Sequence, residues 1–522
     1  MSAATTANPI PLHERITPLT RTIITICVML ATLMQALDST IANVALPYMQ
    51  GTLSANSDQI NWVLTSYVVA AAIMTAPVGW MSARFGPKNV LLVSLVGFTV
   101  TSMLCGIAGS IGEMVLFRFL QGVFGAALVP LSQSTLLNIY SLEKRGPAMS
   151  IWGMGVMLGP ILGPTLGGYL TDLYNWRYVF FVNLPFGILA TVGIIIFMRG
   201  ETELKVPRFD WTGFAILGIA LAGLQLALDR GETKDWFGSN EIIAEAIIAG
   251  LGFYLFTVHM LTTDKPLLPK GIFTDRNMLS AILMMFLVGL VLLSSSALLA
   301  PYLQKLSGYS VREAGLEMAP RGFGTMAAMM ICGRIGTKID VRLQMLVGIL
   351  LLLVSLYWMT LWTPDVSSSW ILTVIIVQGA GLGLVFMPLQ LIAFATLDPR
   401  LRGDGAAAMS LTRNIGMAIG TSVTSAIVTQ MSQYEHAVLS YFVKPFAHVF
   451  TSDSMAAIAP TTAQGAQMMN QIIDRQANII GYGDSFMALM ISTVPCLFLL
   501  FLMRKPKVQP KPAPGEAHVA MD

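Results

Sequence analysis

The stretch Gly153–Tyr169 reads G-M-G-V-M-L-G-P-I-L-G-P-T-L-G-G-Y and decides the fold that we predict. Glycine recurs in it at every fourth position, at Gly155, Gly159, Gly163 and Gly167. On a helix these glycines form a groove that another helix backbone can approach closely. Pro160 and Pro164 each remove a backbone donor and bend a helix, which lipid-embedded helices tolerate because neighbours satisfy the freed carbonyls. The stretch predicts either a tightly packed membrane helix pair or a sliding interface between two moving bundles.

Composition places the whole chain in the membrane. Hydrophobic residues make up 55% of it and charged residues only 11%, with a mean hydropathy of +0.68, so a solvated surface is excluded. The cysteines lie in apolar runs, which argues against a disulfide framework or a metal cluster; they are Cys27, Cys105, Cys332 and Cys496. No phosphate-binding loop, metal-spaced histidines or nucleophile constellation occurs, so we predict no cofactor and no enzyme.

Fourteen apolar runs are long enough to cross about 30 Å of hydrocarbon, which takes roughly 20 residues. They are 23–46, 60–80, 90–110, 114–138, 148–170, 178–198, 211–228, 242–262, 278–300, 314–332, 343–362, 371–396, 404–429 and 484–503. An even number places both termini on one side. That side carries twenty-one lysines and arginines and the other side seven, so we predict that both termini are cytoplasmic.

Short matches repeat along the chain at a nearly constant displacement. Gln121-Gly122 returns as Gln378-Gly379, and Ala148-Met149-Ser150 returns as Ala408-Met409-Ser410. We therefore predict an all-α polytopic fold of two parallel six-helix bundles plus two inserted helices, which rock about a site near the midplane. The predicted parts are a cytoplasmic segment 1–22, an N-terminal bundle 23–198, an insert 199–277, a C-terminal bundle 278–503 with an outer loop 430–483, and a cytoplasmic tail 504–522.

Several motifs carry a family resemblance that covers almost the whole chain. They are Leu37–Pro47 (LDSTIANVALP), Gly79–Lys88, Arg118–Gly122 (RFLQG), the glycine stretch, Asn175–Arg177 (NWR), Asn183–Gly187 (NLPFG) and Asp229–Glu232 (DRGE). Together they resemble the fourteen-span drug/proton antiporters of the EmrB/QacA group in the major facilitator superfamily. The resemblance implies export of hydrophobic or cationic compounds across the bacterial inner membrane, driven by proton entry, often with a periplasmic adaptor and an outer-membrane channel.

The loop after the second span departs from the superfamily pattern G-x-x-x-D-R-x-G. Ala83 stands where the pattern has an acidic residue. The resemblance gives gating roles to Asn43 in the first-span motif and to Arg84, Gly86 and Lys88 in the loop. Arg84 and Lys88 are either parts of a cytoplasmic latch that meets other groups or plain topology charges.

Charged residues inside the spans are the candidate chemical groups, because an ionisable side chain in lipid is costly unless it is paired or functional. Asp38 lies roughly 13 Å and Arg118 roughly 6 Å from the outer ends of their predicted spans, by helical rise. The two form either a proton-coupling pair or a static ion pair. Glu317 and Arg321, four residues apart, are expected to neutralise each other, whereas Arg413 faces the cavity or pairs across it.

The outer loop 430–483 contains an amide-rich run from Gln464 to Asn478, which we expect to form a helix above the membrane. It is either a docking element for an adaptor or a passive cap. The sequence favours a proton-coupled multidrug exporter, and it leaves two alternatives open. One is an exporter of a specific metabolite or siderophore, and the other is an uncoupled facilitator or channel whose intramembrane charges only hold helices together.

Overall fold

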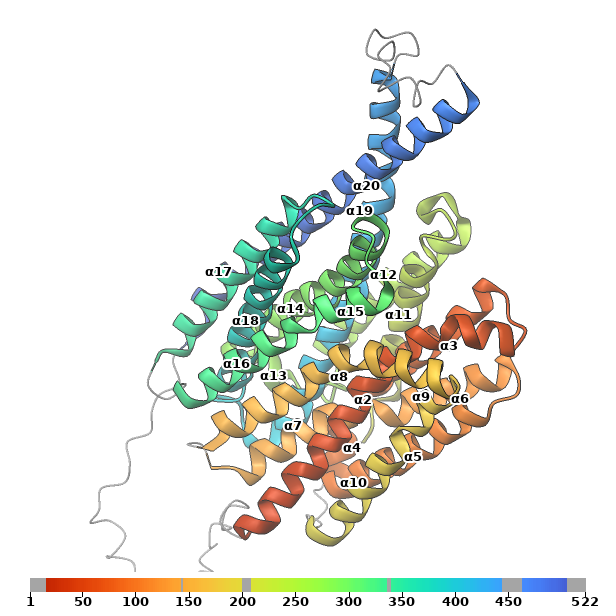
Figure 1. Cartoon of the computed structure of the whole chain (residues 1–522). Helices are drawn as coiled ribbons and strands as arrows, with labels where there is room; N and C mark the ends of the chain where they lie inside the picture. The colour runs from red at the N-terminus through yellow and green to blue at the C-terminus, as the bar shows by residue number, and fades with distance from the viewer. Residues whose placement is uncertain (1–15, 142–143, 200–207, 336–338, 444–461, 505–522) are drawn as a thin grey trace, which may run out of the picture.

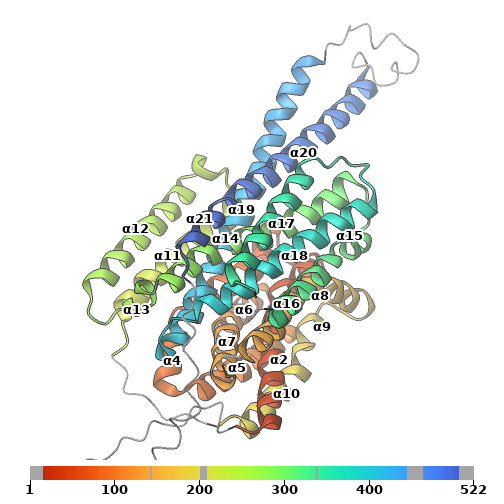
Figure 2. The ribbon, with the colours of Figure 1, turned by 90° about the vertical axis from the view of Figure 1, so that its left-hand side faces the viewer.

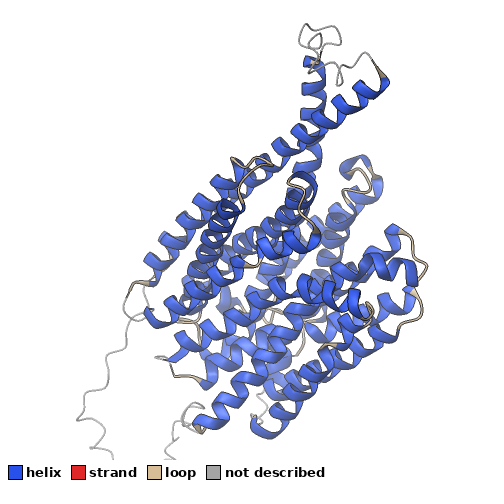
Figure 3. Ribbon diagram, viewed as in Figure 1, coloured by secondary structure: helices blue, strands red, loops and turns tan. Residues whose placement is uncertain are grey.

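The computed structural model describes residues 16–141, 144–199, 208–335, 339–443 and 462–504, and these ranges contain helices and no β-strand (Figures 1 and 3). Most of the predicted N-terminal segment and tail lies outside them. The helices of the N-terminal half are α2 (Pro18–Thr52), α3 (Ser57–Thr75), α4 (Val78–Phe85), α5 (Pro87–Ile107), α6 (Ile111–Gly125), α7 (Leu128–Ile139), α8 (Arg145–Leu173), α9 (Tyr178–Phe181) and α10 (Asn183–Phe197).

The insert and the C-terminal half follow in the same way. The insert consists of α11 (Trp211–Arg230), the short η2 (Trp236–Gly238), α12 (Asn240–Thr262) and α13 (Lys270–Thr274). The C-terminal half consists of α14 (Arg276–Pro301), η3 (Tyr302–Leu306), α15 (Val311–Met318), α16 (Pro320–Ile335), α17 (Val341–Thr360), α18 (Ser368–Ala393), η4 (Pro399–Leu401), α19 (Arg402–Phe442), α20 (Ala463–Thr493) and α21 (Pro495–Leu502).

Each of the fourteen predicted runs coincides with helix. Among the described residues, ten helical segments are long and apolar enough to cross a membrane, and the pair α3 and α4, bent by 57°, makes an eleventh. The remaining three predicted runs fall on α8, on α15 with α16, and on α19. The first span was predicted too short, because α2 continues through Pro47 to Thr52.

The glycine groove of α8 lies against α2 of the same half. A Cβ atom added at Gly159 would lie 2.5 Å from the carbonyl oxygen of Ala36, and one added at Gly167 would lie 2.9 Å from that of Ile41. The hydroxyl of Thr40 also donates to the carbonyl oxygen of Gly159 at 3.2 Å. The four-residue glycine spacing therefore builds a close pair within one bundle, as the first of the two interpretations predicted.

A different part of α8 contacts the C-terminal half. Trp152 stacks on Phe386 of α18 with ring centroids 6.2 Å apart, and a Cβ at Gly153 would lie 3.1 Å from the sulfur of Met329 in α16. The idea that the glycine groove itself slides between bundles is thus wrong for this conformation. The groove is filled by α2, and α8 contacts α15, α16 and α18 of the other half through side chains outside the groove. The side chains of Pro160 and Pro164 lie outside the described residues.

The two halves meet near the end of the bundle where α2 begins. Gln133 of α7 donates to Gln390 of α18 at 2.5 Å, and Arg402 at the start of α19 donates to Asn138 at 3.0 Å. Tyr140, which follows α7, lies 3.0 Å from the hydroxyl of Thr25 in α2. The bonds of Gln133 and Arg402 hold the two halves together at the terminus end, whereas the contact of Tyr140 ties α7 to α2 within the N-terminal half.

At the opposite end, α19 and α20 continue beyond the other helices as a projecting hairpin (Figures 1 and 2). The hydroxyl of Ser432 donates to Asn478 at 3.3 Å, and His436 lies 3.0 Å from the amide oxygen of Asn470. The predicted helix over Gln464 to Asn478 is confirmed as the first part of α20. The predicted outer loop 430–483 is helical up to Phe442 and again from Ala463. Residues 444–461 lie outside the described ranges.

Candidate functional site: a buried carboxylate network

Asp38 and Arg118 form a buried ion pair in the N-terminal half. Asp38 lies near the middle of α2 and Arg118 in the second turn of α6, and both residues are 0% exposed. The Nη1 atom of Arg118 lies 2.6 Å from Oδ2 of Asp38. The prediction that these two charges meet is confirmed in the structure, although their role in coupling stays a prediction.

The guanidinium of Arg118 has further partners that fix its orientation. Its Nε donates to the carbonyl oxygen of Val63 at 3.1 Å, and its Nη1 also donates to Oε1 of Gln121 at 2.9 Å. The ring of Tyr67 lies under the guanidinium, 4.2 Å from its central carbon, and the ring of Phe180 lies 5.7 Å away. Arg118 is therefore enclosed by backbone, amide and aromatic groups as well as by the carboxylate.

Two side-chain amides donate to the other carboxylate oxygen of Asp38. Nε2 of Gln121 lies 2.8 Å and Nδ2 of Asn183 lies 3.3 Å from Oδ1. Asn183, the first residue of α10, also donates to the hydroxyl of Ser102, which in turn donates to the carbonyl oxygen of Phe180. The carboxylate thus joins α2, α6 and α10, and it accepts hydrogen bonds from three different side chains.

Sequence reasoning named Asp38 and Arg118, but it did not assign roles to their amide partners. Gln121 and Asn183 both stood in the motifs RFLQG and NLPFG, so the motifs contained them without showing what they touch. Ser102 and Tyr67 stood in no motif. Their lateral positions depend on how helices pack, which the sequence does not show.

The expected pairing of Glu317 with Arg321 is wrong. Arg321 donates to the hydroxyls of Ser295 and Ser296 and to the carbonyl oxygen of Leu292, all on α14. Oε1 of Glu317 instead accepts from Ser368 at 2.5 Å. Each side chain bonds to a neighbouring helix instead of to the other, Arg321 to α14 and Glu317 to α18, and a proline begins α16 between them. Arg413, on α19, is buried, and its Nε has no hydrogen-bond partner.

The residues with expected gating roles lie apart from the buried network. Asn43 is exposed on α2, and Arg84 is exposed at the end of α4. Gly86 joins α4 to α5 with φ 82°, a conformation that favours glycine. Lys88 donates to the carbonyl oxygen of Ile195 at 3.0 Å, so it ties α5 to α10 within its own half.

An acidic residue approaches the loop with Ala83 from the other half. Asp404, in the first turn of α19, packs directly on Gly79, where an added Cβ would lie 2.7 Å from the Cα of Asp404. Glycine at position 79 is therefore required by a close contact between the halves. Sequence reasoning did not single out Asp404.

The described residues contain no cluster of three or more histidine, cysteine, aspartate or glutamate side chains that could hold a metal ion. The four cysteines are free and buried in helices. Around Asp38 the polar partners are a guanidinium, two side-chain amides and, beyond them, the hydroxyl of Ser102.

Comparison with known proteins identifies relatives over most of the chain. The model of the Major Facilitator Superfamily matches residues 28–421. The multidrug export protein EmrB of Escherichia coli strain K12 is 35% identical over 472 residues, which cover 89% of this chain and 91% of that protein. The fatty acid resistance protein FarB of Neisseria gonorrhoeae is 32% identical and covers 92% of this chain and 96% of its own length.

A solved structure shares the fold at low sequence identity. The human organic anion transporter MFSD10 aligns with a TM-score of 0.56 and 15% identity over 93% of this chain and 100% of that chain. At 15% identity this match shows only that the two proteins share an arrangement of helices.

Proposed function

Because the chain belongs to the major facilitator superfamily and is an EmrB-type multi-pass transporter, we propose that it exports hydrophobic or cationic compounds in exchange for protons. The observation that carries the proton-coupling step is the buried carboxylate of Asp38, the one Asp or Glu side chain among the described residues that is fully buried. An ionisable group at this depth in a transporter is a functional candidate because its burial is costly.

The geometry suggests how proton binding would change the helix contacts. Asp38 accepts from Arg118 at Oδ2 and from two amides at Oδ1, so the ionised form uses both oxygens as acceptors. A protonated carboxyl has an O–H that needs an acceptor, yet donors surround it. Proton uptake would therefore break at least one of these hydrogen bonds and loosen α2 from α6 and α10.

Arg118 has partners that can hold it after such a step. The carbonyl oxygen of Val63, Oε1 of Gln121 and the ring of Tyr67 remain in reach when the carboxyl becomes neutral. The guanidinium stays charged, since arginine side chains keep their proton in proteins. The N-terminal half thus offers a two-state element in which proton occupancy and helix packing are linked.

The test replaces Asp38 by asparagine in purified protein reconstituted into vesicles with an imposed pH gradient. The amide keeps the size and loses the titratable group, so pH-driven efflux of a hydrophobic dye should vanish while insertion and folding persist. Asp172→Asn serves as the matched control, because Asp172 accepts from Tyr48 in an exposed contact of the same half. Undiminished pH-driven efflux by Asp38→Asn protein would remove Asp38 from the coupling role. Downhill movement without proton flux in the unmutated protein would establish an uncoupled facilitator.

The substrate class is supported by names of relatives, which include a multidrug export protein and a fatty acid resistance protein. Export of one specific metabolite or siderophore remains the alternative. Competition in the same vesicles separates a multidrug exporter from an exporter of one compound. Chemically unrelated hydrophobic compounds should each slow efflux of the dye from a multidrug exporter, because they share its binding site.

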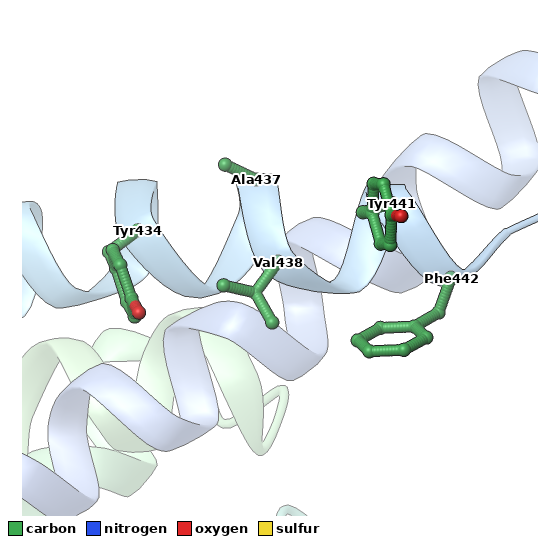
Figure 4. A pocket seen from close by; sticks show the side chains of 5 residues that line it. All are labelled: Tyr434, Ala437, Val438, Tyr441 and Phe442. Carbon is green, nitrogen blue, oxygen red and sulfur yellow. The ribbon is translucent and has the colours of Figure 1, made fainter.

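We extend the proposal to the orientation and to an adaptor. With the termini in the cytoplasm, as the distribution of basic residues favours, the α19–α20 hairpin stands on the periplasmic side. Near its tip, Tyr434, Ala437, Val438, Tyr441 and Phe442 line a shallow apolar pocket, as Figure 4 shows. Tyr441 is 82% and Phe442 71% exposed. Exposed aromatic side chains at a projecting site suit contact with a periplasmic membrane-fusion adaptor, which would lead to an outer-membrane channel.

The double substitution Tyr441→Ser with Phe442→Ser tests this docking surface. We expect loss of adaptor co-purification and of cellular resistance while transport in vesicles continues. Phe237→Ser is the control, since Phe237 is 70% exposed in the connection between α11 and α12, on the same proposed side. Capture of the adaptor by the doubly substituted protein would show that the hairpin aromatics are not the docking surface, and failure of transport in vesicles would favour a lid over the outer cavity.

A further inference from the structure

The two halves differ in the charge that they bury. Among the described residues, the buried aspartate, glutamate, lysine and arginine side chains are Asp38, Arg118, Arg321 and Arg413. Asp38 and Arg118 neutralise each other in the N-terminal half. The C-terminal half therefore buries two guanidinium groups, and none of the described carboxylates forms an ion pair with either of them.

The two cations have different surroundings. Arg321 is held by the hydroxyls of Ser295 and Ser296 and by the carbonyl oxygen of Leu292, which satisfy its donors without cancelling its charge. Arg413 is 8% exposed, and its Nε lacks any hydrogen-bond partner. A guanidinium cannot escape its charge by losing a proton, so an unpaired one in the membrane interior carries a large desolvation cost. An anion beside it would remove that cost.

Both arginines contact the same stretch of α14 near mid-depth, Arg413 through its backbone and Arg321 through its side chain. The backbone of Arg413 packs on Gly289, where an added Cβ would lie 3.1 Å from the Cα of Arg413. Arg321 reaches α14 at residues 292–296, so the two contacts are about 5 to 10 Å apart along that helix. By helical rise, Arg413 lies roughly 17 Å from the start of α19 at Arg402, and Arg321 lies roughly 21 Å from the end of α16 at Ile335. Both of these helix ends are at the terminus end of the bundle.

Unpaired polar atoms and apolar side chains complete the surroundings on the same helices. The hydroxyl of Ser294 on α14 is buried without a partner, and an added Cβ at Gly420 of α19 would touch it. Met284, Met285 and Val288 on α14 and Met409 on α19 belong to one buried apolar cluster. The hydroxyl of Ser294 and the side chains of Met284, Met285 and Val288 each lie within about two helical turns of Gly289, on which Arg413 packs.

We propose that Arg413, with Arg321 adding positive charge along α14, forms a binding site for the carboxylate of an amphiphilic substrate, whose apolar tail packs among the buried methionine side chains of α14 and α19. The inference rests on the proposed function and adds anionic amphiphiles to its substrates. A carboxylate matches the planar guanidinium with two parallel hydrogen bonds and neutralises the buried charge. The static reading of Arg413 as a helix anchor does not account for its unpartnered Nε.

Equilibrium binding tests the site without any gradient, so its result is independent of proton coupling. Purified protein in zwitterionic nanodiscs is titrated with laurate, with dodecanol and with dodecyltrimethylammonium. We expect Arg413→Gln to raise the Kd of laurate about ten-fold or more, the usual worth of a hydrogen bond to a charged group, with little change for the other two probes. Arg413→Lys should recover part of the affinity because it restores the charge without the planar fork.

The matched control is Arg475→Gln, because Arg475 donates to the carbonyl oxygen of Leu306 at the base of the hairpin and belongs to neither buried arginine site. Its laurate affinity should equal that of the unmutated protein. Equal laurate affinity in Arg413→Gln protein, or an equal loss for laurate and dodecanol, overturns the proposal. A second series in nanodiscs containing phosphatidylglycerol distinguishes substrate from lipid: displacement of laurate by this lipid would assign the site to an anionic head group and overturn its assignment to substrate.

Discussion

Gly159 lies where the backbone of α8 packs directly on Ala36 of α2, and its replacement by alanine tests what that close contact contributes. The new Cβ would lie 2.5 Å from the carbonyl oxygen of Ala36, whereas heavy atoms in favourable contact lie about 3.5 Å apart or more. The two helices must therefore separate by about 1 Å, which also stretches the hydrogen bond from Thr40 to the carbonyl oxygen of Gly159. Overpacking of this kind costs about 1 to 3 kcal/mol, so we expect the free energy of unfolding to fall by that amount.

The assay uses the four buried, free cysteines, which react with a thiol-specific dye only after the bundle opens. Gly155→Ala on the same helix is the matched control, because a Cβ there meets only the side chain of Met29, with the terminal Cε at 2.8 Å. A flexible methionine end can move aside, and a backbone carbonyl cannot. Gly159→Ala protein should therefore unfold at a clearly lower temperature than Gly155→Ala protein. If the two variants unfold together, the close pair does not limit stability and the reasoning fails.

Three further predictions concern the terminus end of the bundle. Gly86→Ala should destabilise the protein by about 1 to 3 kcal/mol, because its φ of 82° is strained for a residue with a Cβ; an unchanged melting temperature would refute this. Gly79→Ala should slow transport, since its Cβ would displace Asp404 of the other half; turnover in vesicles measures the effect, and an unmutated rate would show that the contact does not limit turnover. Cysteines at Gln133 and Gln390 should crosslink and stop transport until reduced, because these positions join the two halves; full transport by the crosslinked protein would mean that this contact never opens.

The arrangement of helices follows from features that act over long stretches of sequence. The apolar runs, the repeat and the motifs all report on whole spans, and each predicted run coincides with helix. Span ends were less predictable, since α2 and α19 continue as helix well beyond the apolar part of their sequence. A helix does not need lipid once neighbouring helices and capping groups stabilise its backbone.

The sequence predicted how deep each residue of the candidate site lies along its helix. It did not predict which residues of neighbouring helices lie beside it. The depths of Asp38 and Arg118 follow from helical rise, and the structure pairs them. Asn183 joins the same carboxylate because α10 packs beside α2, which no local pattern shows. The pairing of Glu317 with Arg321 failed because each side chain bonds to a neighbouring helix, Arg321 to α14 and Glu317 to α18, and the sequence does not show these neighbours.

The hydrogen bond between Gln133 and Gln390 has a consequence for the origin of the fold. The two residues are 257 positions apart, the same displacement that relates Gln121 to Gln378 in the internal repeat. Gln133 and Gln390 therefore occupy equivalent positions of the two repeats, and they pair across the pseudo-twofold axis that relates the repeats. An amide suits such a place, because it carries a donor and an acceptor and can meet an identical group, whereas a carboxylate or an ammonium would repel its copy. A six-span ancestor assembling as a symmetric dimer would already have made this bond, so duplication and fusion of its gene would have inherited a working interface.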